Sequence, residues 1–430
     1  MLSFSHPTGN RNVRAVLSSF DKAGMLAEFQ TTISTNPDAL WLRLLPHHLR
    51  QELLRRSFPI PSDKIRTSPL LEFLRMALPK LGVKKPVEHE VGWASIDSVY
   101  RQVDKLSAHN LERLTKHHNM SAVYAYEDCA LHTFKRAKSM GLTCIYDLPI
   151  AYWETIRKLM REEAERLPDW VVTLGGGIKD TAKKLDHKTQ ELELADVIIG
   201  PGQFVKDSLP AWAMNKKVII SPFGSPELTM QSSGIGLPVK MYGKQPLRVL
   251  FAGSMGQRKG LADLFEAVRM LNTPEIELVV MGSLLAPLEF YKTKLPRLIY
   301  EEGRLHEEVL ALMRTCDVFC LPSIVEGRAL VMQEAMSQGL PLIITPNSGG
   351  ADLIKEAQTG FLVPIRAPEI IAEKLSWFLE HRRELPEMGK LAQEHAALYT
   401  WENYGKNIIK ELTDFLDVKD SQNSNQSRFS

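Results

Sequence analysis

Residues 321–346, with the sequence LPSIVEGRALVMQEAMSQGLPLIITP, decide the fold class of this chain. The segment reads as the end of an apolar strand, a polar loop at 326–328, a helix over about 330–338, and a second apolar strand over 340–345. Gly339 ends the helix in the way a C-cap glycine does. A strand, a helix and a strand in this order favour a parallel α/β sheet.

Two carboxylates, Glu326 and Glu334, stand on either side of the loop and helix start, with seven residues between them. The free backbone N–H groups at a helix start favour an anion. A carboxylate about one turn into the helix, such as Glu334, can reach a sugar diol beside that anion. A phosphate cradle beside a carboxylate is the arrangement that a nucleotide-sugar site requires, so we expect such a site here.

A second phosphate-binding segment is indicated earlier in the chain. Residues 248–254 read as an apolar strand, and a loop then leads into an amphipathic helix over 259–271. Gly253 lies at the strand tip, and Arg258 and Lys259 follow at the helix start. A glycine, which leaves the backbone open to a ligand, together with two cations at a helix N-terminus is the outline of a pyrophosphate site. The alternative is that both cations are only solvated.

The composition is that of a globular protein with more than one domain. The chain has 430 residues, of which 44% are hydrophobic and 24% charged. Its start, MLSFSHPTGN, lacks the basic and apolar regions of a signal peptide, and no apolar run reaches about 18 residues. We therefore expect a cytoplasmic protein without a membrane span. The net charge of +2 does not indicate nucleic-acid binding.

Four cysteines in a chain of this length do not form a disulfide framework, and they fit a reducing cytosol. Cys316 and Cys320 have no histidine or second cysteine pair nearby, so no metal site is expected there.

Two positions at strand ends in the first half are candidate site residues. Gly9 follows a strand over 1–7, and glycine there lets the backbone approach a ligand, although an ordinary turn explains it equally well. Asp147 ends an apolar strand over 143–147 and is a candidate base or acceptor contact. Alternatively, Asp147 caps the helix that starts near residue 150.

Residues 42–85 form a basic stretch with ten lysines and arginines against three acids. Apolar residues recur between these charges at helical spacing. Such a helical insertion could lie on an anionic membrane surface or receive an acidic acceptor. It could equally be a solvated insertion with one packed face.

Strands alternate with helices along the whole chain, which predicts doubly wound sheets. The glycine-rich region 223–245 has no periodicity and marks the domain boundary. We predict an N-terminal acceptor domain over 1–227 and a C-terminal donor domain over 228–400. A last helix over 401–418 and a disordered tail over 419–430, rich in Ser, Asn and Gln, complete the prediction.

Taken together, these motifs resemble the second domain of retaining glycosyltransferases with the GT-B fold, the large family called glycosyltransferase family 4 or glycosyl transferases group 1. The resemblance covers about 170 residues, and the ordered series is more specific than any single motif. The matching positions are Gly253, Arg258-Lys259-Gly260, Leu321-Pro322-Ser323, Glu326, Glu334 to Gly339, Asn347 to Ile354 and Thr359 to Pro364, with a weaker match at Glu193 to Asp196, Lys206 and Pro222 to Gly224. Arg328 stands where many members have an aromatic residue.

The resemblance implies two Rossmann-like domains that face each other across a cleft. It also implies a role for each matching residue. Arg258 and Lys259 would hold the donor diphosphate, Glu334 the ribose hydroxyls, and Glu326 would face the donor sugar near its anomeric carbon. The N–H groups of Ala329, Leu330 and Val331 would contact the phosphates. Gly303, Arg304 and Leu305 would line the base pocket, Asp147 would lie near the acceptor, and the helix from residue 401 would cross back onto the first domain.

The resemblance predicts a retaining hexosyltransferase that uses a nucleotide-sugar donor and an unknown glycan, lipid or small-molecule acceptor, without nucleic acid. The sequence has no Asp-x-Asp pair to hold a metal, so fixed cations and a helix N-terminus would stabilise the leaving diphosphate without a metal cofactor. The alternatives are an inert nucleotide-sugar-binding homologue and another enzyme on the same fold, such as a nucleotide-sugar epimerase or a phosphorylase.

Overall fold

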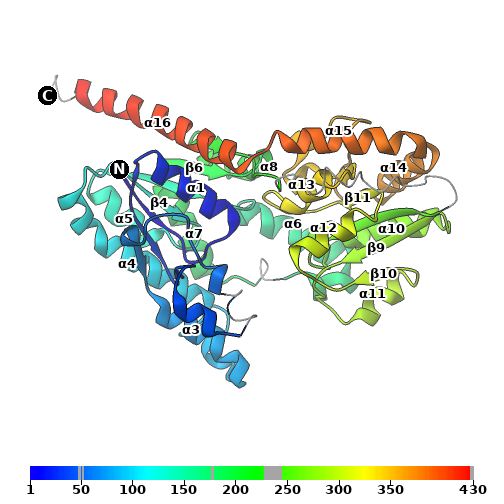
Figure 1. Ribbon diagram of the computed structural model, residues 1–430, viewed down its shortest axis with the longest axis horizontal. Coiled ribbons are helices and arrows are strands. Elements are labelled where there is room, and N and C mark those ends of the chain that lie inside the picture. Colours follow the sequence, from blue (N-terminus) through cyan, green and yellow to red (C-terminus); the bar gives the residue numbers. More distant parts are fainter. Residues whose placement is uncertain (47–49, 51–52, 176–178, 227–244, 427–430) are drawn as a thin grey trace.

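The protein has two lobes, each built around one parallel β-sheet with helices packed around it (Figure 1). The structure is a computed structural model, and it describes residues 1–430 except 47–49, 51–52, 176–178, 227–244 and 427–430. The predicted domain boundary at 227 and 228 therefore lies outside the described residues. The last strand of the first sheet ends at Ile220, and the first strand of the second sheet begins at Leu247.

The first sheet has the strand order β3-β2-β1-β4-β5-β6-β7, and all its pairs are parallel. Its strands are β1 (Leu2–Ser5), β2 (Leu26–Thr31), β3 (Ile65–Thr67), β4 (Ala122–Tyr126), β5 (Thr143–Asp147), β6 (Val197–Gly200) and β7 (Lys217–Ile220). The central strands are buried along their whole length, which is why they read as continuous apolar runs and not as alternating ones.

The second sheet has the order β10-β9-β8-β11-β12-β13 and is also parallel. Its strands are β8 (Leu247–Ala252), β9 (Ile276–Met281), β10 (Ile299–Glu301), β11 (Val318–Leu321), β12 (Leu342–Ile344) and β13 (Gly360–Leu362). In both sheets the strand order turns back beside the first strand in the chain, and ligands of open α/β sheets bind at the carboxyl ends of strands beside such a point.

Most helices lie between successive strands of a sheet, and the last three follow the final strand β13. The helices are α1 (Arg11–Lys22), α3 (Pro69–Ala77), α4 (Ile96–His117), α5 (Leu131–Ser139), α6 (Trp153–Arg166), α7 (Ala182–Leu194), α8 (Gln203–Asp207), α10 (Leu261–Leu271), α11 (Leu288–Lys294), α12 (His306–Met313), α13 (Leu330–Ser337), α14 (Pro368–Glu380), α15 (Leu385–Ala397) and α16 (Trp401–Gln426). Short 3-10 turns include η5 (Pro168–Thr173) and η8 (Gln257–Lys259).

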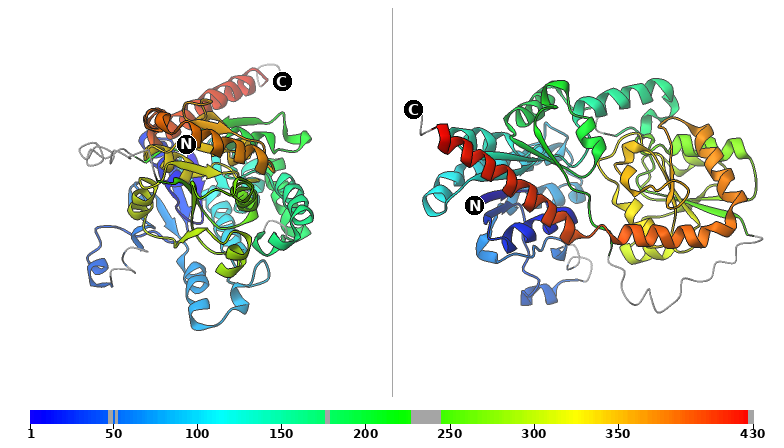
Figure 2. Two further views of the ribbon diagram at one scale, coloured as in Figure 1. Left: turned by 90° about the vertical axis from the view of Figure 1, so that its right-hand side faces the viewer. Right: turned by 90° about the horizontal axis from the view of Figure 1, so that it is seen from above.

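The last helix, α16, lies along the first lobe after the chain leaves the second (Figures 1 and 2). Tyr404, Ile408 and Leu412 are spaced by four residues, so they share one helix face, and this face is buried in the core of the first domain. At Gly405 the helices approach so closely that a methyl group would lie 1.8 Å from the Ser19 hydroxyl of α1.

The structure differs from the predicted tail. The helix does not end at 418, because α16 continues to Gln426, and the rest of the predicted disordered tail, 427–430, lies outside the described residues. Lys419 explains part of the extension: its ammonium donates a hydrogen bond to the Thr143 hydroxyl at 2.9 Å, which holds the helix against the end of the sheet. Ser, Asn and Gln are weak helix formers but do not break a helix that is already nucleated.

The basic stretch 42–85 is not a purely helical insertion. Residues 65–67 form β3, which extends the first sheet by pairing with β2. A strand of three residues is too short to produce a visible alternation in the sequence. Several of its cations are already paired: Arg56 and Arg75 with the buried Glu72 of the same stretch, and Lys64 with Asp21 of α1.

The prediction that residues 1–227 all belong to the first domain is also corrected. Helix α6 and turn η5 lie against the second lobe (Figure 2). Trp170 is 5% exposed and belongs to the core of the second domain, where its ring meets Phe265 and Tyr291 edge-on. The charged helix α6 carries no sequence signal of the domain on which it packs, because its contacts, apolar and ionic, are with residues far away in the chain.

Candidate functional site

The β8–α10 loop carries the two cations predicted from the sequence. The chain leaves β8 at Gly253, where φ is 147° and a methyl group would lie 2.8 Å from the side chain of Lys259. Glycine is therefore required both for the backbone angle and for the approach of the lysine. Arg258 and Lys259 follow within the turn η8, directly before α10.

Both cations converge on one carboxylate oxygen. The Oε1 atom of Glu326 accepts hydrogen bonds from Arg258 Nη1 at 2.8 Å and from Lys259 Nζ at 2.5 Å. Burial lowers the pKa of Lys259, and the charge of Arg258 lowers it further, whereas Glu326 raises it. Two positive groups beside one negative group leave this point of the site able to attract a further anion.

Helix α6 and turn η5, from the first half of the chain, contact this loop and support it through Gln257. The buried Gln257 side chain donates to Glu163 of α6 at 2.7 Å and to Asp263 at 2.9 Å, and accepts from the N–H of Ala262 at 2.9 Å. Its backbone N–H donates to the Thr173 hydroxyl at 3.1 Å. Because Arg258 and Lys259 are the next two residues, these contacts set the position of both cations.

Glu163 is the centre of that support. Its side chain is fully buried and forms ion pairs with Arg166 and Arg366 as well as the hydrogen bond with Gln257. Burial acts to raise the pKa of Glu163, but the hydrogen bonds from Arg166 and Gln257 prevail and hold the pKa below its ordinary value. The carboxylate is therefore charged when it bridges α6 to the second domain.

The start of α13 provides backbone donors at the same place. Leu330 and Val331 are the first residues of the helix, and their N–H groups have no acceptor among the described residues. Ala329 differs from the prediction, because its N–H donates to the carbonyl of Ser348 at 3.2 Å. An anion at this helix start would thus be offered two N–H groups and not three.

Glu334 lies one turn into α13, with its side chain 20% exposed and His306 Nδ1 at 3.7 Å. Burial raises the pKa of Glu334, while the charges of His306 and Arg11 lower it. Arg11 belongs to α1 of the first domain, so its charge acts across the gap between the domains. A partly buried carboxylate of this kind suits neutral hydrogen-bond donors such as sugar hydroxyls.

Arg328 is neither a solvated loop residue nor a free cation. It is 4% exposed, and its guanidinium binds Asp352 in a bidentate pair at 2.7 and 3.1 Å and donates to Gln333 at 2.8 Å. The same group lies over the ring of Tyr399. Arg328 therefore supports the loop that carries Glu326.

A cavity of about 590 Å³ lies between the domains, at the carboxyl ends of the strands of both sheets. Seven of the predicted residues line it, namely Gly253, Lys259, Glu326, Ala329, Leu330, Val331 and Glu334. The first domain supplies Asn10, Asn12, Pro149 and Phe223. At Gly327 the domains touch, since a methyl group there would lie 1.8 Å from the carbonyl oxygen of Pro149.

The other predicted residues lie outside this lining. Arg258 lies beside it, bound to Glu326. Arg304 pairs with Glu301, and Leu305 is 65% exposed directly before α12. At Gly9 a methyl group would lie 2.4 Å from the ring of Phe58, so packing alone accounts for the glycine. Roles for these residues in ligand binding stay predictions.

Asp147 is completely buried at the end of β5, and its Oδ2 atom has no hydrogen-bond partner among the described residues. Burial raises its pKa to about 7, although the Tyr124 hydroxyl acts in the opposite direction. It does not line the cavity, whereas Pro149, two residues further on, does. Its predicted contact with the acceptor stays a prediction.

The sequence reasoning missed several lining residues. Met281, Gly282 and Ser283 lie at the end of β9, and Val309 lies on α12. The first three could have been found by treating the carboxyl end of every predicted strand as part of the site. Val309 had no such signal, because an apolar residue on a helix normally indicates core packing.

Residues 241–395 match the family model of "Glycosyl transferases group 1". A D-inositol 3-phosphate glycosyltransferase of Corynebacterium urealyticum is 32% identical over 104 residues, which are 24% of each chain. The sulfoquinovosyl transferase SQD2 of Arabidopsis thaliana is 30% identical over 210 residues, 47% of this chain and 39% of the relative. The chain thus spans about a quarter to two fifths of the length of such curated relatives.

Solved structures match nearly the whole chain. Sucrose-phosphate synthase from Thermosynechococcus elongatus has a TM-score of 0.62 at 16% identity and covers 97% of this chain and 99% of its own. The fold is GT-B. Anabaena HepE, solved with UDP-glucose, has a TM-score of 0.56 at 13% identity and covers 96% of this chain and 99% of its own. At these identities the likeness concerns the fold alone, and it confirms the predicted architecture of two Rossmann-like domains.

Substituting Glu163→Gln should weaken the binding of a nucleoside diphosphate about tenfold, because Gln257 would lose a hydrogen bond to a charged group, which contributes about 1.5–3 kcal/mol, and would keep only its contacts with Asp263, Ala262 and Thr173. Calorimetric titration with UDP and GDP measures this. Glu162→Gln is the matched control, since Glu162 also pairs with Arg366 but no contact joins it to Gln257. Equal affinities of the two variants would contradict the positioning role.

Substituting Asp147→Asn should stabilise the protein at pH 8 more than at pH 4. The pKa of Asp147 is about 7 in the folded protein and near 3.9 when unfolded, so its contribution to stability is complete below the unfolded pKa and is lost as the pH rises through 7. Thermal unfolding over this pH range gives the difference, with the exposed Asp207→Asn as control. A pH-independent difference would show that the Asp147 carboxyl titrates normally.

Proposed function

We propose that this protein is a glycosyltransferase that moves a hexose from a nucleoside-diphosphate sugar to a hydroxyl group. The observation that carries the proposal is the convergence of Arg258, Lys259, the start of α13 and Glu334 around one interdomain cavity. Cations and N–H groups suit a diphosphate, and a carboxylate one helical turn away suits the ribose diol. The match of residues 241–395 to glycosyl transferases group 1 supports the same function.

The donor diphosphate would bind at Lys259 and Arg258, with the N–H groups of Leu330 and Val331 directed at its oxygens. Glu326 already accepts hydrogen bonds from both cations, so a bound diphosphate would compete with this carboxylate for them. Displacement of Glu326 toward the sugar would bring it to the anomeric carbon. Structures similar to this chain hold UDP and UDP-glucose, which supports a nucleotide-sugar donor.

We propose that the reaction retains the anomeric configuration and needs no metal. The bond between the anomeric carbon and the diphosphate oxygen breaks, and the acceptor oxygen forms its bond on the same face. The proton of the acceptor hydroxyl passes to the leaving diphosphate oxygen, so no protein base is required. Arg258, Lys259 and the α13 start stabilise the charge that develops on the diphosphate. Among the described residues, no observation favours an inert homologue or an epimerase.

We also place the protein in the cytoplasm, with the basic stretch 42–85 in contact with the inner face of a membrane. Within the described part of the chain, no helix is long and apolar enough to cross a bilayer. Exposed apolar side chains of this stretch include Leu70, Phe73 and Leu81, and the exposed Lys80, Lys84 and Lys85 lie beside the last of them. Apolar groups beside lysines suit the interface of an anionic bilayer.

The glycosyltransferase proposal is tested with purified protein, EDTA and a panel of UDP-, GDP- and ADP-sugars. We expect slow release of one nucleoside diphosphate that does not depend on metal. Lys259→Ala should lower this rate about a hundredfold or more, as loss of one charge-stabilising group does. The exposed Lys390→Ala is the control for loss of charge. If no nucleotide sugar binds, or if Lys259→Ala turns over normally, the donor-site assignment fails.

The membrane contact is tested by sedimentation with vesicles. Binding should be seen with vesicles that contain phosphatidylglycerol and not with phosphatidylcholine alone, and it should weaken with salt. Replacing Lys80, Lys84 and Lys85 together by Gln should lower the bound fraction, because each lysine near the surface contributes about 1 kcal/mol. Equal binding of this variant and the natural protein would rule out the contact.

A further inference from the structure

A second cavity, of about 380 Å³, lies in the first domain between α4, α5 and α7. It shares no lining residue with the interdomain cavity. Arg101 and Lys105 reach it from α4, His132 from α5, and Lys183 from α7. Its size is within the range of cavities that hold small organic ligands.

The cations of this cavity are not balanced by its acids. Asp97 is already paired with Lys184 at 2.9 Å, and Asp128 is paired with Lys188 at 3.3 Å. By contrast, Arg101, Lys105 and Lys183 have no ion-pair partner among the described residues, although they face a common space. The remaining acid, Asp186, accepts a hydrogen bond from Gln190 at 2.7 Å through its Oδ2 atom and forms no ion pair among the described residues.

The two histidines of the lining have pKa shifts in opposite directions, since burial lowers the pKa of His187 but the hydrogen bond and charge of Glu191 raise it above its ordinary value. Burial lowers the pKa of the His132 imidazole; Asp104 raises the pKa, whereas the charges of Lys105 and Lys135 lower it. Asp104 is itself committed, because it accepts from the N–H groups of His132 and Thr133 at 2.7 and 2.8 Å. The start of α5 is therefore already satisfied, and the attraction for an anion comes from side chains and not from a helix end.

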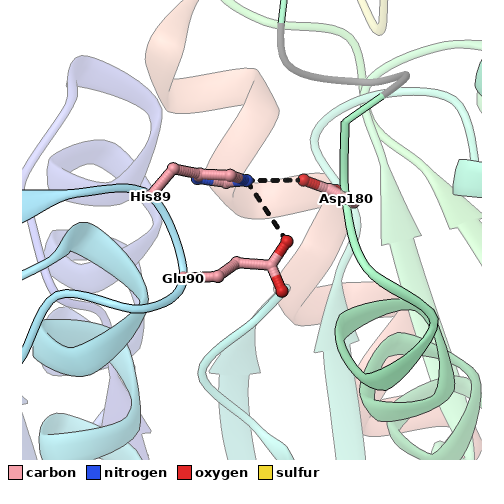
Figure 3. A group of neighbouring side chains, drawn as sticks. All are labelled: His89, Glu90 and Asp180. Atoms are coloured by element: carbon pink, nitrogen blue, oxygen red, sulfur yellow. Dashed lines mark hydrogen bonds and ion pairs between the residues drawn. The ribbon is translucent and has the colours of Figure 1, made fainter.

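A metal ion is not the occupant that this region favours. Figure 3 shows His89, Glu90 and Asp180 pointing toward one another from two loops, with His89 Nε2 at 3.0 Å from Asp180 and 3.3 Å from Glu90. Lys184 Nζ lies 3.4 Å from the same Asp180 oxygen and so already supplies a positive charge. Through Lys184 and Asp97 this group ties the loops before α4 and α7 together, which fixes two walls of the cavity.

The lining also limits the chemistry of the ligand. Leu131 is its single apolar residue and no aromatic ring but imidazole lines it, so a nucleotide base would find no stacking surface. Arginine and lysine from two helices suit the oxygens of a phosphate group. We propose that this cavity binds a small molecule that carries a phosphate group, at a site separate from the donor cavity.

The probe is inorganic phosphate, titrated calorimetrically into the full chain at constant ionic strength with chloride as the reference anion. We expect one site whose affinity falls about tenfold in Arg101→Gln and several-fold in Lys105→Gln, because each removes a charge-assisted hydrogen bond. Lys116→Gln should bind as the natural protein does. Lys116 is an exposed lysine on the same helix, three turns further on and outside the cavity.

The Lys259→Ala variant separates this site from the donor site. Phosphate binding that survives in Lys259→Ala and is lost in Arg101→Gln supports the second site, whether or not a nucleotide sugar is ever bound. The opposite pattern would place the phosphate between the domains and overturn the inference. The inference would also be overturned if phosphate bound equally well to Arg101→Gln, Lys105→Gln and Lys116→Gln. That result would mean an adventitious ion only.

Two further arms identify where the phosphate group comes from, and both rest on the proposed glycosyl transfer. In the first arm, a hexose 6-phosphate is offered as the acceptor. If it becomes part of the product, and Lys105→Gln raises the KM for the hexose 6-phosphate without changing the KM for the donor, the phosphate group belongs to the acceptor. If inorganic phosphate alone changes the rate of nucleoside diphosphate release, and Arg101→Gln removes that response, the phosphate is an effector. Either result supports the site.

Discussion

The pairing of Arg258 and Lys259 with one oxygen of Glu326 is the interaction around which the candidate site is built. Lys259 is largely buried, and a buried charge is strongly destabilising unless it is paired. Glu326 satisfies this need by linking the end of β8 to the end of β11. The same arrangement leaves one positive charge in excess, which is what a diphosphate requires.

Each neighbouring element helps to hold that cluster. On one side, Glu163 of α6 fixes Gln257 directly before Arg258. On the other side, Arg328 follows Glu326 by two residues and anchors the loop of Glu326 to Asp352. The wider consequence is that the donor loop depends on residues from the first half of the chain, so α6 is expected to move with the second domain in any change of domain orientation.

The fold and the cavity lining contributed by the second domain were predictable because they depend on local patterns. Gly253 with Arg258 and Lys259, and Glu326 with Glu334, are motifs at fixed spacing after apolar strands, and parallel sheets bring strand ends together. The acceptor side was not predictable to the same degree. Asp147 has the expected position in its strand, yet its side chain is buried and lies outside the cavity lining, which no spacing reveals.

By itself, the sequence determined the alternation of strands and helices, the GT-B architecture and seven residues of the cavity lining, since short motifs follow one another in a recognisable order over about 170 residues. Only the tertiary structure decided which residues meet across long separations. It placed α6 on the second domain, β3 in the first sheet, and Arg101 with Lys183 around one cavity. The physical reason is that side-chain packing and ion pairing depend on distance in space, and residues far apart in the chain leave no common pattern in a single sequence.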